Sequence, residues 1–435
     1  MKTRWLVFAV LGSGFFCTMA AAADWPQWRG PNRDGNSEEK GLLQEWPKEG
    51  PKLLWQVNDI GEGYATPAVV GNRLYLLSSL GLDDEYVQSL NVADGRQAWI
   101  THIGKVGNPD QKPPFPMARS TPTVDGDLLY ALGSDGDLVC METAAGNVRW
   151  KKNLQSDFGG KPGQWAYSES PLIDGDVLVC TPGGSEATLL ALGKKTGKVI
   201  WKSAVPGGDE AAYASVTIAE AAGHKQYVQF LQKGVAGVDA KTGKFLWRYD
   251  ATGPGPANIP TPVAHGDFVY SSCGRSPTGH TGGALVRLKA DGDGVAAEEV
   301  YFKQGLPNCI GGAMLVGENL YGTTAQGLLC ADYATGSVRW QEKCIGIGSL
   351  LCADGRLYIH GENGDVALVE ATPDGYHEKG RFTPPEQPKH LHGPMEKAWA
   401  YPVVADGRLY IRDQGTLWCY DVRQSQSSAP NVIRD

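Results

Sequence analysis

The chain has 435 residues, with 40 lysines and arginines against 48 aspartates and glutamates, which gives a formal net charge of −8. An acidic chain without a basic cluster argues against a nucleic acid or an anionic membrane surface as its partner. The 57 glycines and 13 tryptophans, in a chain that is 42% hydrophobic, favour many short strands joined by tight turns.

The N-terminus has the features of a secretory signal. Lys2 and Arg4 precede an apolar run over residues 5–16, and small residues follow up to Ala23. This order predicts cleavage after Ala23 and a periplasmic or secreted protein. No transmembrane segment is predicted, because a Gly-Ser-Gly step at residues 12–14 interrupts the run and a spanning helix needs about 20 apolar residues. The predicted parts are a signal peptide (1–23), an N-terminal extension (24–50), a repeat domain (51–424) and a C-terminal tail (425–435).

From residue 51 onward the sequence repeats a unit of four short strands. Residues 121–150, 170–201 and 311–340 show this unit most plainly. Its last turn has a glycine four residues before a tryptophan, in the pairs Gly95/Trp99, Gly146/Trp150, Gly197/Trp201, Gly243/Trp247 and Gly336/Trp340. Successive repeat tryptophans from Trp55 to Trp247 lie 44 to 51 residues apart, which is the size of one propeller blade.

Eight such units predict an all-β fold, an eight-bladed β-propeller of four-stranded antiparallel blades. The units begin near Thr66, Thr121, Ser170, Ser215, Thr261, Gly312, Ser349 and Tyr401. The last unit stops before its fourth strand, whereas residues 52–56 read as a fourth strand with nothing before it. We therefore expect the N- and C-terminal ends to share one blade, with Leu53–Gln56 paired to Leu417–Tyr420, which closes the ring and leaves few strand edges. An open solenoid or two smaller domains is the alternative.

The stretch Gly237–Trp247 resembles the tryptophan-docking repeat of quinoprotein dehydrogenases. Residues 51–424 as a whole resemble the pyrroloquinoline-quinone-like repeat family, which implies a propeller whose tryptophans dock neighbouring blades. That family contains both quinone-dependent enzymes and a scaffold lipoprotein of outer-membrane barrel assembly. The opening residues 24–31, with the motif Trp25-Pro26-Gln27-Trp28, are similar to the start of many exported proteins of this type, and we expect these tryptophans to pack onto the propeller.

The longer connections fall on one face, which we call the top face: the face at which each innermost strand begins. Binding sites in propellers and similar scaffolds lie in such loops. The residues before the innermost strands should rim the central funnel, and on one side of the ring they include Tyr64, Arg119, Glu169 and Trp399. Trp165, Arg275 and Lys397, on loops that reach the same face, are further candidates. Together they could hold a planar, partly anionic ligand by stacking and charge-assisted hydrogen bonds; alternatively, Arg119 and Glu169 form a structural ion pair and the aromatic rings plug the channel.

Two functions fit these features. The first is a non-catalytic binding or scaffold protein that holds a small ligand or a protein partner at its top face. The second, implied by the resemblance, is a dehydrogenase of alcohols or sugars that uses pyrroloquinoline quinone with calcium. Enzymes of that family have an adjacent Cys-Cys pair, which this sequence lacks, and a Glu–Asn calcium site, which Glu169 and Asn258 match in residue type only. The sequence therefore favours binding.

The cysteines follow the repeat. Cys140, Cys330 and Cys419 occupy the third-strand position of three blades, so we expect buried side chains that lie too far apart to pair. Cys309 and Cys344 precede the innermost strands of adjacent blades, and an oxidising compartment would permit a disulfide between them, although their registers differ by two residues.

Overall fold

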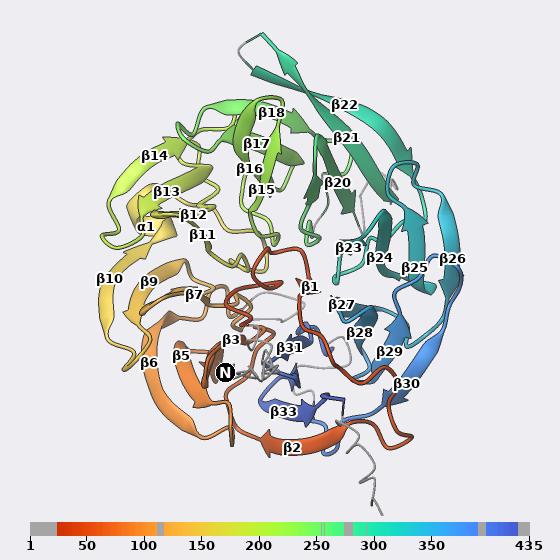
Figure 1. The fold of residues 1–435 in the computed structure, drawn as a ribbon. Coiled ribbons are helices and arrows are strands. Elements are labelled where there is room, and N and C mark those ends of the chain that lie inside the picture. Colours follow the sequence, from red (N-terminus) through yellow and green to blue (C-terminus); the bar gives the residue numbers. More distant parts are fainter. Residues whose placement is uncertain are drawn as a thin grey trace, which may run out of the picture.

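The computed structural model describes residues 24–110, 117–253, 255, 257–273, 282–292, 294–389 and 397–424. In these ranges eight sheets surround a central axis, which Figure 1 views end-on. Seven sheets have four strands and one has five. The predicted all-β, eight-bladed propeller is therefore confirmed. In the same ranges no helix reaches the length and apolar character that a bilayer crossing requires.

Within each blade the antiparallel strands follow one another from the axis outward. Blades 1 to 4 contain β3 (Ala68–Val70), β4 (Arg73–Leu80), β5 (Asp84–Asn91) and β6 (Gln97–Lys105); β7 (Thr123–Asp125), β8 (Leu128–Leu132), β9 (Asp137–Glu142) and β10 (Val148–Asn153); β11 (Leu172–Asp174), β12 (Val177–Cys180), β13 (Leu189–Gly193) and β14 (Val199–Ser203); and β15 (Thr217–Ala221), β16 (His224–Phe230), β17 (Val235–Asp239) and β18 (Phe245–Tyr249). A short helix, α1 (Leu154–Phe158), lies between blades 2 and 3.

Blades 5 to 8 continue the same order. They contain β19 (Val263–His265), β20 (Phe268–Cys273), β21 (Gly282–Asp291) and β22 (Gly294–Lys303); β23 (Ala313–Val316), β24 (Asn319–Thr324), β25 (Gly327–Asp332) and β26 (Val338–Glu342); β27 (Gly348–Ala353), β28 (Arg356–Gly361), β29 (Val366–Glu370) and β30 (Glu378–Phe382); and β31 (Val403–Ala405), β32 (Arg408–Asp413) and β33 (Thr416–Asp421), with β2 (Lys52–Val57) as the outermost strand of blade 8.

The repeat tryptophans dock one blade onto the next. Trp150, on the outermost strand of blade 2, donates its indole N–H to the Lys194 carbonyl of blade 3 at 2.9 Å. Its ring covers Gly197, where an added Cβ would stand 2.9 Å from the ring and where φ is +64°. Only glycine suits both the turn and this close approach. The same arrangement recurs in the pairs Trp55/Gly95, Trp99/Gly146 and Trp201/Gly243.

The outer strand of blade 4 is an exception because a long hairpin covers it. Strands β21 and β22 extend beyond the rim of the ring, at the top of Figure 1, and β22 lies against β18. The Tyr249 hydroxyl of β18 donates to the Glu299 carboxylate of β22 at 2.6 Å. Trp247 is consequently only 3% exposed, and it donates to Gln226 of its own blade at 2.5 Å. Trp247 therefore donates its hydrogen bond within its own sheet, while its ring packs in a core cluster that blades 4 and 5 share.

The two ends of the described chain close the ring in blade 8. Strand β2 pairs antiparallel with β33, and Leu53 lies opposite Tyr420 while Trp55 lies opposite Cys419. This is the pairing that the sequence predicted. The adjoining seam between blades 8 and 1 is held by Arg412, which is fully buried and donates to the carbonyls of Ala65, Leu77, Gly61 and Gln414 at 2.8 to 3.1 Å.

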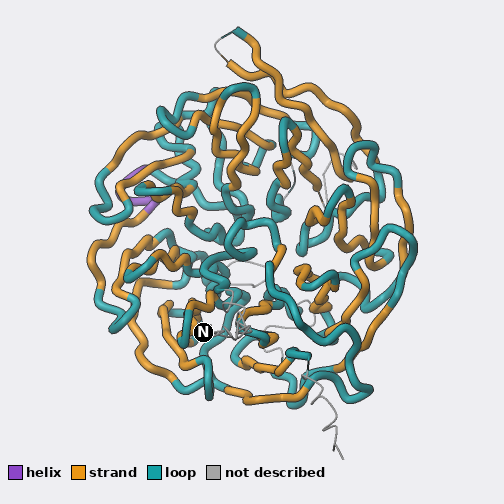
Figure 2. The backbone as a smooth tube through the Cα atoms, in the orientation of Figure 1, coloured by secondary structure: helices purple, strands orange, loops and turns teal. Residues whose placement is uncertain are grey.

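Residues 24–37, which we call the N-terminal segment, run across the middle of the ring (Figures 1 and 2). Trp25 forms an antiparallel bridge with Val69 of blade 1, and β1 (Asn36–Ser37) pairs in parallel with β27 of blade 7. Between these ends, Arg29 and Arg33 donate to backbone carbonyls of blades 3, 4 and 6. The segment thus fills the central channel. Trp25 is 2% exposed, so the expected packing of this tryptophan onto the propeller is confirmed.

The cysteines of the third strands are buried as predicted. Cys140, Cys330 and Cys419 lie on β9, β25 and β33 and are 0% exposed. Cys309 and Cys344 both lie in the described ranges and both remain thiols. The disulfide considered between them is therefore not formed in the structure.

Candidate functional site

A cavity of about 220 Å³ lies on the axis at the top face. Thirteen of the described residues line it, and six of these are aromatic. They are Trp28, Tyr64, Thr66, Arg119, Trp165, Ser168, Tyr213, Ser215, Ala257, Ile259, Ile310, Trp399 and Tyr401. Arg119 is the one charged residue among these lining residues. The cavity therefore combines aromatic walls with a single cation.

The propeller repeat delivers these side chains to the axis. In seven of the blades, the residue that stands three or four positions before the innermost strand lines the cavity. In order from blade 1 to blade 6 and then blade 8, these residues are Tyr64, Arg119, Ser168, Tyr213, Ile259, Ile310 and Trp399. Of these seven, the alignment of the repeat units predicts Tyr64, Arg119 and Trp399 as rim residues. The arrangement gives the cavity a polar side at blades 2 and 3 and an aliphatic side at blades 5 and 6.

The polar side is built around Arg119. Its Nη1 donates to the Trp165 carbonyl at 2.5 Å, and its guanidinium carbon lies 6.0 Å from the centre of the Tyr64 ring. Burial lowers the pKa of Arg119, but an arginine stays charged at any physiological pH. No carboxylate in the described ranges forms an ion pair with it. The cation is therefore only partly compensated.

Three hydrogen-bond donors on this side lack a partner among the described residues. They are Nη2 of Arg119, the indole Nε1 of Trp165 and Oγ of Ser168, and each is screened from water. An unsatisfied buried donor costs about 1–3 kcal/mol, and more when it is charged. All three belong to residues that line one wall of the cavity, so this wall has donors that a hydrogen-bond acceptor could use.

Two aromatic pairs flank the cation. The rings of Tyr64 and Trp399 lie 4.9 Å apart at an interplanar angle of 48°, and those of Trp165 and Tyr213 lie 5.8 Å apart at 56°. The Tyr213 hydroxyl accepts a hydrogen bond from the Trp165 backbone N–H at 3.0 Å, and Trp399 donates to Glu362 at 2.9 Å. These contacts hold the rings in place, so they offer rigid stacking surfaces.

Trp28 of the N-terminal segment forms the floor. Its ring meets Tyr401 edge-on, with the ring centres 5.8 Å apart. The guanidinium carbons of Arg29 and Arg33 lie 5.4 and 5.7 Å from the Trp28 ring centre, in positions that allow cation–π attraction. Both arginines are at most 5% exposed. The sequence predicts only packing for Trp28. The other lining residues that are not among the predicted candidates are Thr66, Ser168, Tyr213, Ser215, Ala257, Ile259, Ile310 and Tyr401.

Glu169 does not line the cavity. It is 2% exposed, and its Oε2 accepts a hydrogen bond from the Thr181 backbone N–H at 2.8 Å. Burial raises the pKa of Glu169 to about 8 although Arg33 lies near enough to lower it. Glu169 accepts from Thr181 and Arg119 donates to the Trp165 carbonyl, so the structure does not form the bridge between them that the sequence leaves as an alternative. The sequence placed Glu169 on the rim, but Ser168, the residue before it, takes that position.

Of the three further candidates on the top-face loops, one lines the cavity. Trp165 lines the cavity, whereas Lys397 is half-buried and does not line it. Arg275 lies outside the described residues. The structure thus brings Tyr64, Arg119, Trp165 and Trp399 together around one cavity.

Residues 36–181 and 83–342 match a protein-family model described as outer membrane protein assembly factor BamB. The chain belongs to this family. A curated BamB from Yersinia pestis is 23% identical over 283 residues, which are 61% of this chain and 63% of that protein. The tetrathionate hydrolase of Acidithiobacillus ferrooxidans is 24% identical over 224 residues, 49% of this chain and 40% of that protein. The chain therefore spans less than two thirds of the length of these curated relatives.

Solved structures share the BamB-family fold. The crystal structure of BamB from Moraxella catarrhalis aligns with a TM-score of 0.57 at 13% identity, over 86% of this chain and 98% of that one. Quinohemoprotein alcohol dehydrogenase from Comamonas testosteroni aligns with a TM-score of 0.62 at 13% identity, over 94% and 82% of the two chains. The predicted resemblance to quinoprotein-like propellers is confirmed. At these identities the likeness is one of fold.

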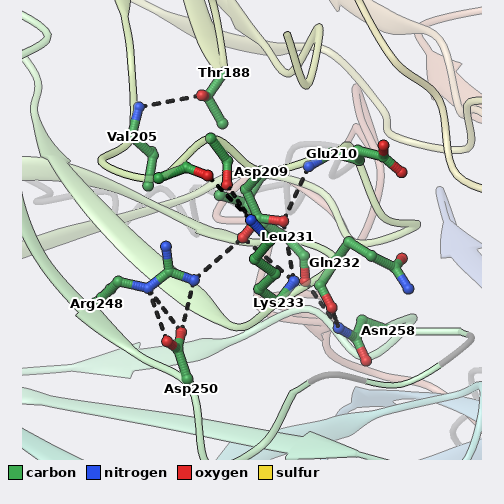
Figure 3. Close-up of polar contacts among 12 residues, drawn as sticks. Thr188, Val205, Asp209, Glu210, Leu231, Gln232, Lys233, Arg248, Asp250 and Asn258 are labelled. Atoms are coloured by element: carbon green, nitrogen blue, oxygen red, sulfur yellow. Dashed lines mark hydrogen bonds and ion pairs between the residues drawn. The ribbon is translucent and has the colours of Figure 1, made fainter. Parts of the chain in front are cut away.

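A calcium-assisted quinone site does not fit the residues of this BamB-family chain. Calcium needs several oxygen ligands around one point, and none of the described residues that line the cavity is a carboxylate. Asn258, the second calcium candidate, donates its amide to the carbonyls of Leu231 and Gln232 at 2.8 and 2.9 Å (Figure 3). In the described ranges no three His, Cys, Asp or Glu side chains gather in a way that could hold a metal ion.

Figure 3 also shows what Asn258 and its neighbours do instead. The buried Asp209 accepts hydrogen bonds from the backbone N–H groups of Glu210 and Lys233 and pairs with Arg248 at 3.3 Å. These contacts, with those of Asn258, fasten the connections before and after blade 4 to the turn between β16 and β17. This cluster is a structural support for the top face.

Proposed function

We propose that this protein is an exported, non-catalytic binding protein that holds a small ligand in the axial cavity at its top face. The observation that carries the proposal is the partly compensated Arg119 on a cavity wall with two further unsatisfied donors. Each such donor lowers the stability of the folded protein. A ligand that accepts their hydrogen bonds removes this cost.

The polarity of the cavity supports binding over redox catalysis. A quinone-dependent dehydrogenase requires a general base and a metal next to its cofactor. The lining residues contain no carboxylate and no histidine, and the two calcium candidates hydrogen-bond elsewhere. Long connections at the same face leave room for a protein partner as well, in line with the assembly-factor name of the relatives.

The test is a calorimetric titration of the purified protein with three probes: benzoate, benzamide and pyrroloquinoline quinone with calcium. We expect at least one probe to bind with one-to-one stoichiometry and the Trp399→Ala variant to lose that binding. Arg149→Gln, which changes an exposed arginine on the outer strand of blade 2, should retain it. Absence of binding by all three probes, or binding that Trp399→Ala leaves intact, would contradict the proposal. Dye reduction by the protein with quinone, calcium and an alcohol would instead establish a dehydrogenase.

A further inference from the structure

The size of the cavity limits its ligand. An apolar protein cavity of roughly 150 Å³ is large enough to bind benzene. The cavity here is about 220 Å³. An aromatic ring with a short substituent fits inside it, whereas a cofactor of three fused rings would have to project from its open side. The ligand should therefore contain a single ring.

The charges around the cavity call for one negative charge. Arg119 supplies a single cation to the lining, and no acid among the lining residues offsets it. Beneath the floor, Arg29 and Arg33 add positive charge, although their donors are largely engaged by backbone carbonyls. A guanidinium with neighbouring N–H and O–H donors matches the two oxygens of a carboxylate. A monoanion is thus the charge that this wall accommodates.

The lining also has a direction. The donors of Arg119, Trp165 and Ser168 lie on blades 2 and 3, whereas Ile259 and Ile310 lie on blades 5 and 6. A bound molecule with one charged and one apolar end would therefore lie across the axis in a single orientation. Its middle would pass over the Trp28 ring, and aromatic side chains prefer flat, offset-stacked partners.

We infer that the cavity binds a small aromatic monocarboxylate, with its carboxylate at Arg119 and its ring between Trp28 and the aliphatic wall. The inference rests on the proposed binding function and names the ligand class of that site. Arg119, Trp165 and Ser168 line the wall that contacts the carboxylate, and their unpartnered donors reach it after small rotations of the side chains, because these atoms lie just below the cavity surface. Trp28 determines how thick the ligand can be, because its ring closes the cavity from below.

The experiment compares four probes by isothermal titration calorimetry on the purified protein. Benzoate carries both proposed features, benzamide lacks the charge, cyclohexanecarboxylate lacks the flat ring, and pyrroloquinoline quinone exceeds the size. We expect benzoate to bind most tightly. Benzamide should bind about tenfold or more weakly, because a charge-assisted contact is worth more than a neutral one. Cyclohexanecarboxylate should bind roughly three- to tenfold more weakly through the loss of stacking.

Variants assign the contact to its residue. Arg119→Gln should weaken benzoate binding by about tenfold or more and change benzamide binding by no more than about twofold. Ser168→Ala, a smaller change on the same wall, should weaken benzoate binding by about two- to fivefold. Arg149→Gln is the matched control, since this arginine lies on the exposed outer strand of the same blade as Arg119. A near-ultraviolet circular dichroism spectrum shows that each variant is folded.

The outcomes separate the ligand class from the binding function. Equal affinities for benzoate and benzamide, or an Arg119→Gln variant that binds benzoate normally, would overturn the aromatic monocarboxylate. If benzamide or the quinone binds more tightly than benzoate and Trp399→Ala abolishes that binding, the ligand class is wrong and the binding function stands. If none of the four probes binds, both are contradicted.

Discussion

Two buried carboxyl groups of the propeller differ in protonation from exposed ones. Glu85 is fully buried, accepts hydrogen bonds from the backbone N–H and hydroxyl of Ser134 at 2.7 and 2.5 Å, and has its pKa raised by burial to about 7. Burial also raises the pKa of Glu169 to about 8. Near neutral pH these two acids are therefore largely or partly uncharged. A protonated Glu85 offsets little of the positive charge of Arg119, which is then available to an anion in the cavity.

Glu169 should make stability depend on pH. Its folded-state pKa of about 8 lies above the ordinary value of 4.5, so the folded protein holds a proton that the unfolded chain releases. Stability is thus highest below pH 4.5 for this group, falls as the pH rises from 4.5 to about 8, and stays lowered above that. Glu169→Gln keeps the oxygen that accepts from Thr181 and removes the titration.

We expect Glu169→Gln to be more stable than the wild type by roughly 1–3 kcal/mol at pH 8.5 and about equally stable near pH 4.5. Urea unfolding at a series of pH values measures the difference, which cancels the contribution of Glu85. The exposed Glu186, changed to Gln, serves as the control and should show no such trend. A Glu169→Gln advantage that is constant with pH would show that Glu169 does not titrate in this window.

The orientation of Glu169 was not predictable from the sequence for a residue-level reason. Ser168 and Glu169 are consecutive in an extended connection, and successive side chains of extended backbone point to opposite sides. Alignment of the units gives the position of the pair to within one residue. Glu169 points away from the axis because it meets the Thr181 backbone N–H and the charge of Arg33 there. Both groups belong to other elements of the fold, so the sequence around Glu169 does not reveal them.

At the scale of strands and blades, the tryptophan contact is the repeated link between neighbouring sheets. Trp55 of β2 donates to the Val92 carbonyl of blade 1 at 2.9 Å, and its ring covers Gly95. This contact also joins the strand from the N-terminal side of the chain to the first complete blade. It therefore stabilises the ring at blade 8, whose outermost strand β2 is not connected through a turn to its neighbour β33.

Trp55→Ala should destabilise the protein by roughly 2–4 kcal/mol, because it removes a large aromatic contact and a hydrogen bond between blades. The value lies below that of a fully buried tryptophan, since Trp55 is half-buried. Chemical denaturation followed by tryptophan fluorescence measures it. Leu54→Ala is the control on the same strand; Leu54 is 36% exposed, and its loss should cost less than about 1 kcal/mol. Equal effects of the two substitutions would contradict the docking role of Trp55.

At the scale of the whole molecule, sequence motifs that recur along the chain predict the ring of blades. Contacts between residues far apart in the sequence form the centre of that ring. The blade count, the shared blade and the axial positions follow from turns and strands that recur within about 50 residues. The N-terminal segment gave no comparable signal. Arg33 reaches Ser170 across 137 positions and Arg29 reaches Ala313 across 284 positions. Such contacts do not repeat along the sequence, so the position of Trp28 at the floor of the cavity could not be predicted from it.

The N-terminal segment should resist proteolysis until the entire ring unfolds. Arg29 and Arg33 are trypsin sites, but they are 4% and 5% exposed and are held by carbonyls of three blades. We expect no cleavage at either site in the native protein, and cleavage in denaturant that follows the global unfolding curve. Mass spectrometry of tryptic fragments checks this. Cleavage at these sites below the unfolding transition would show that the segment detaches on its own.

The path of this segment has a consequence for the order of folding. Residues 24–37 leave the ribosome before any of the blades that bind them, and their partners in blades 6 and 7 follow about 280 to 320 positions later. Until then the segment has no complete docking surface. The N-terminal segment is synthesised first but is therefore among the last parts of the propeller to reach its final position. The floor of the cavity can form only after all eight blades have folded.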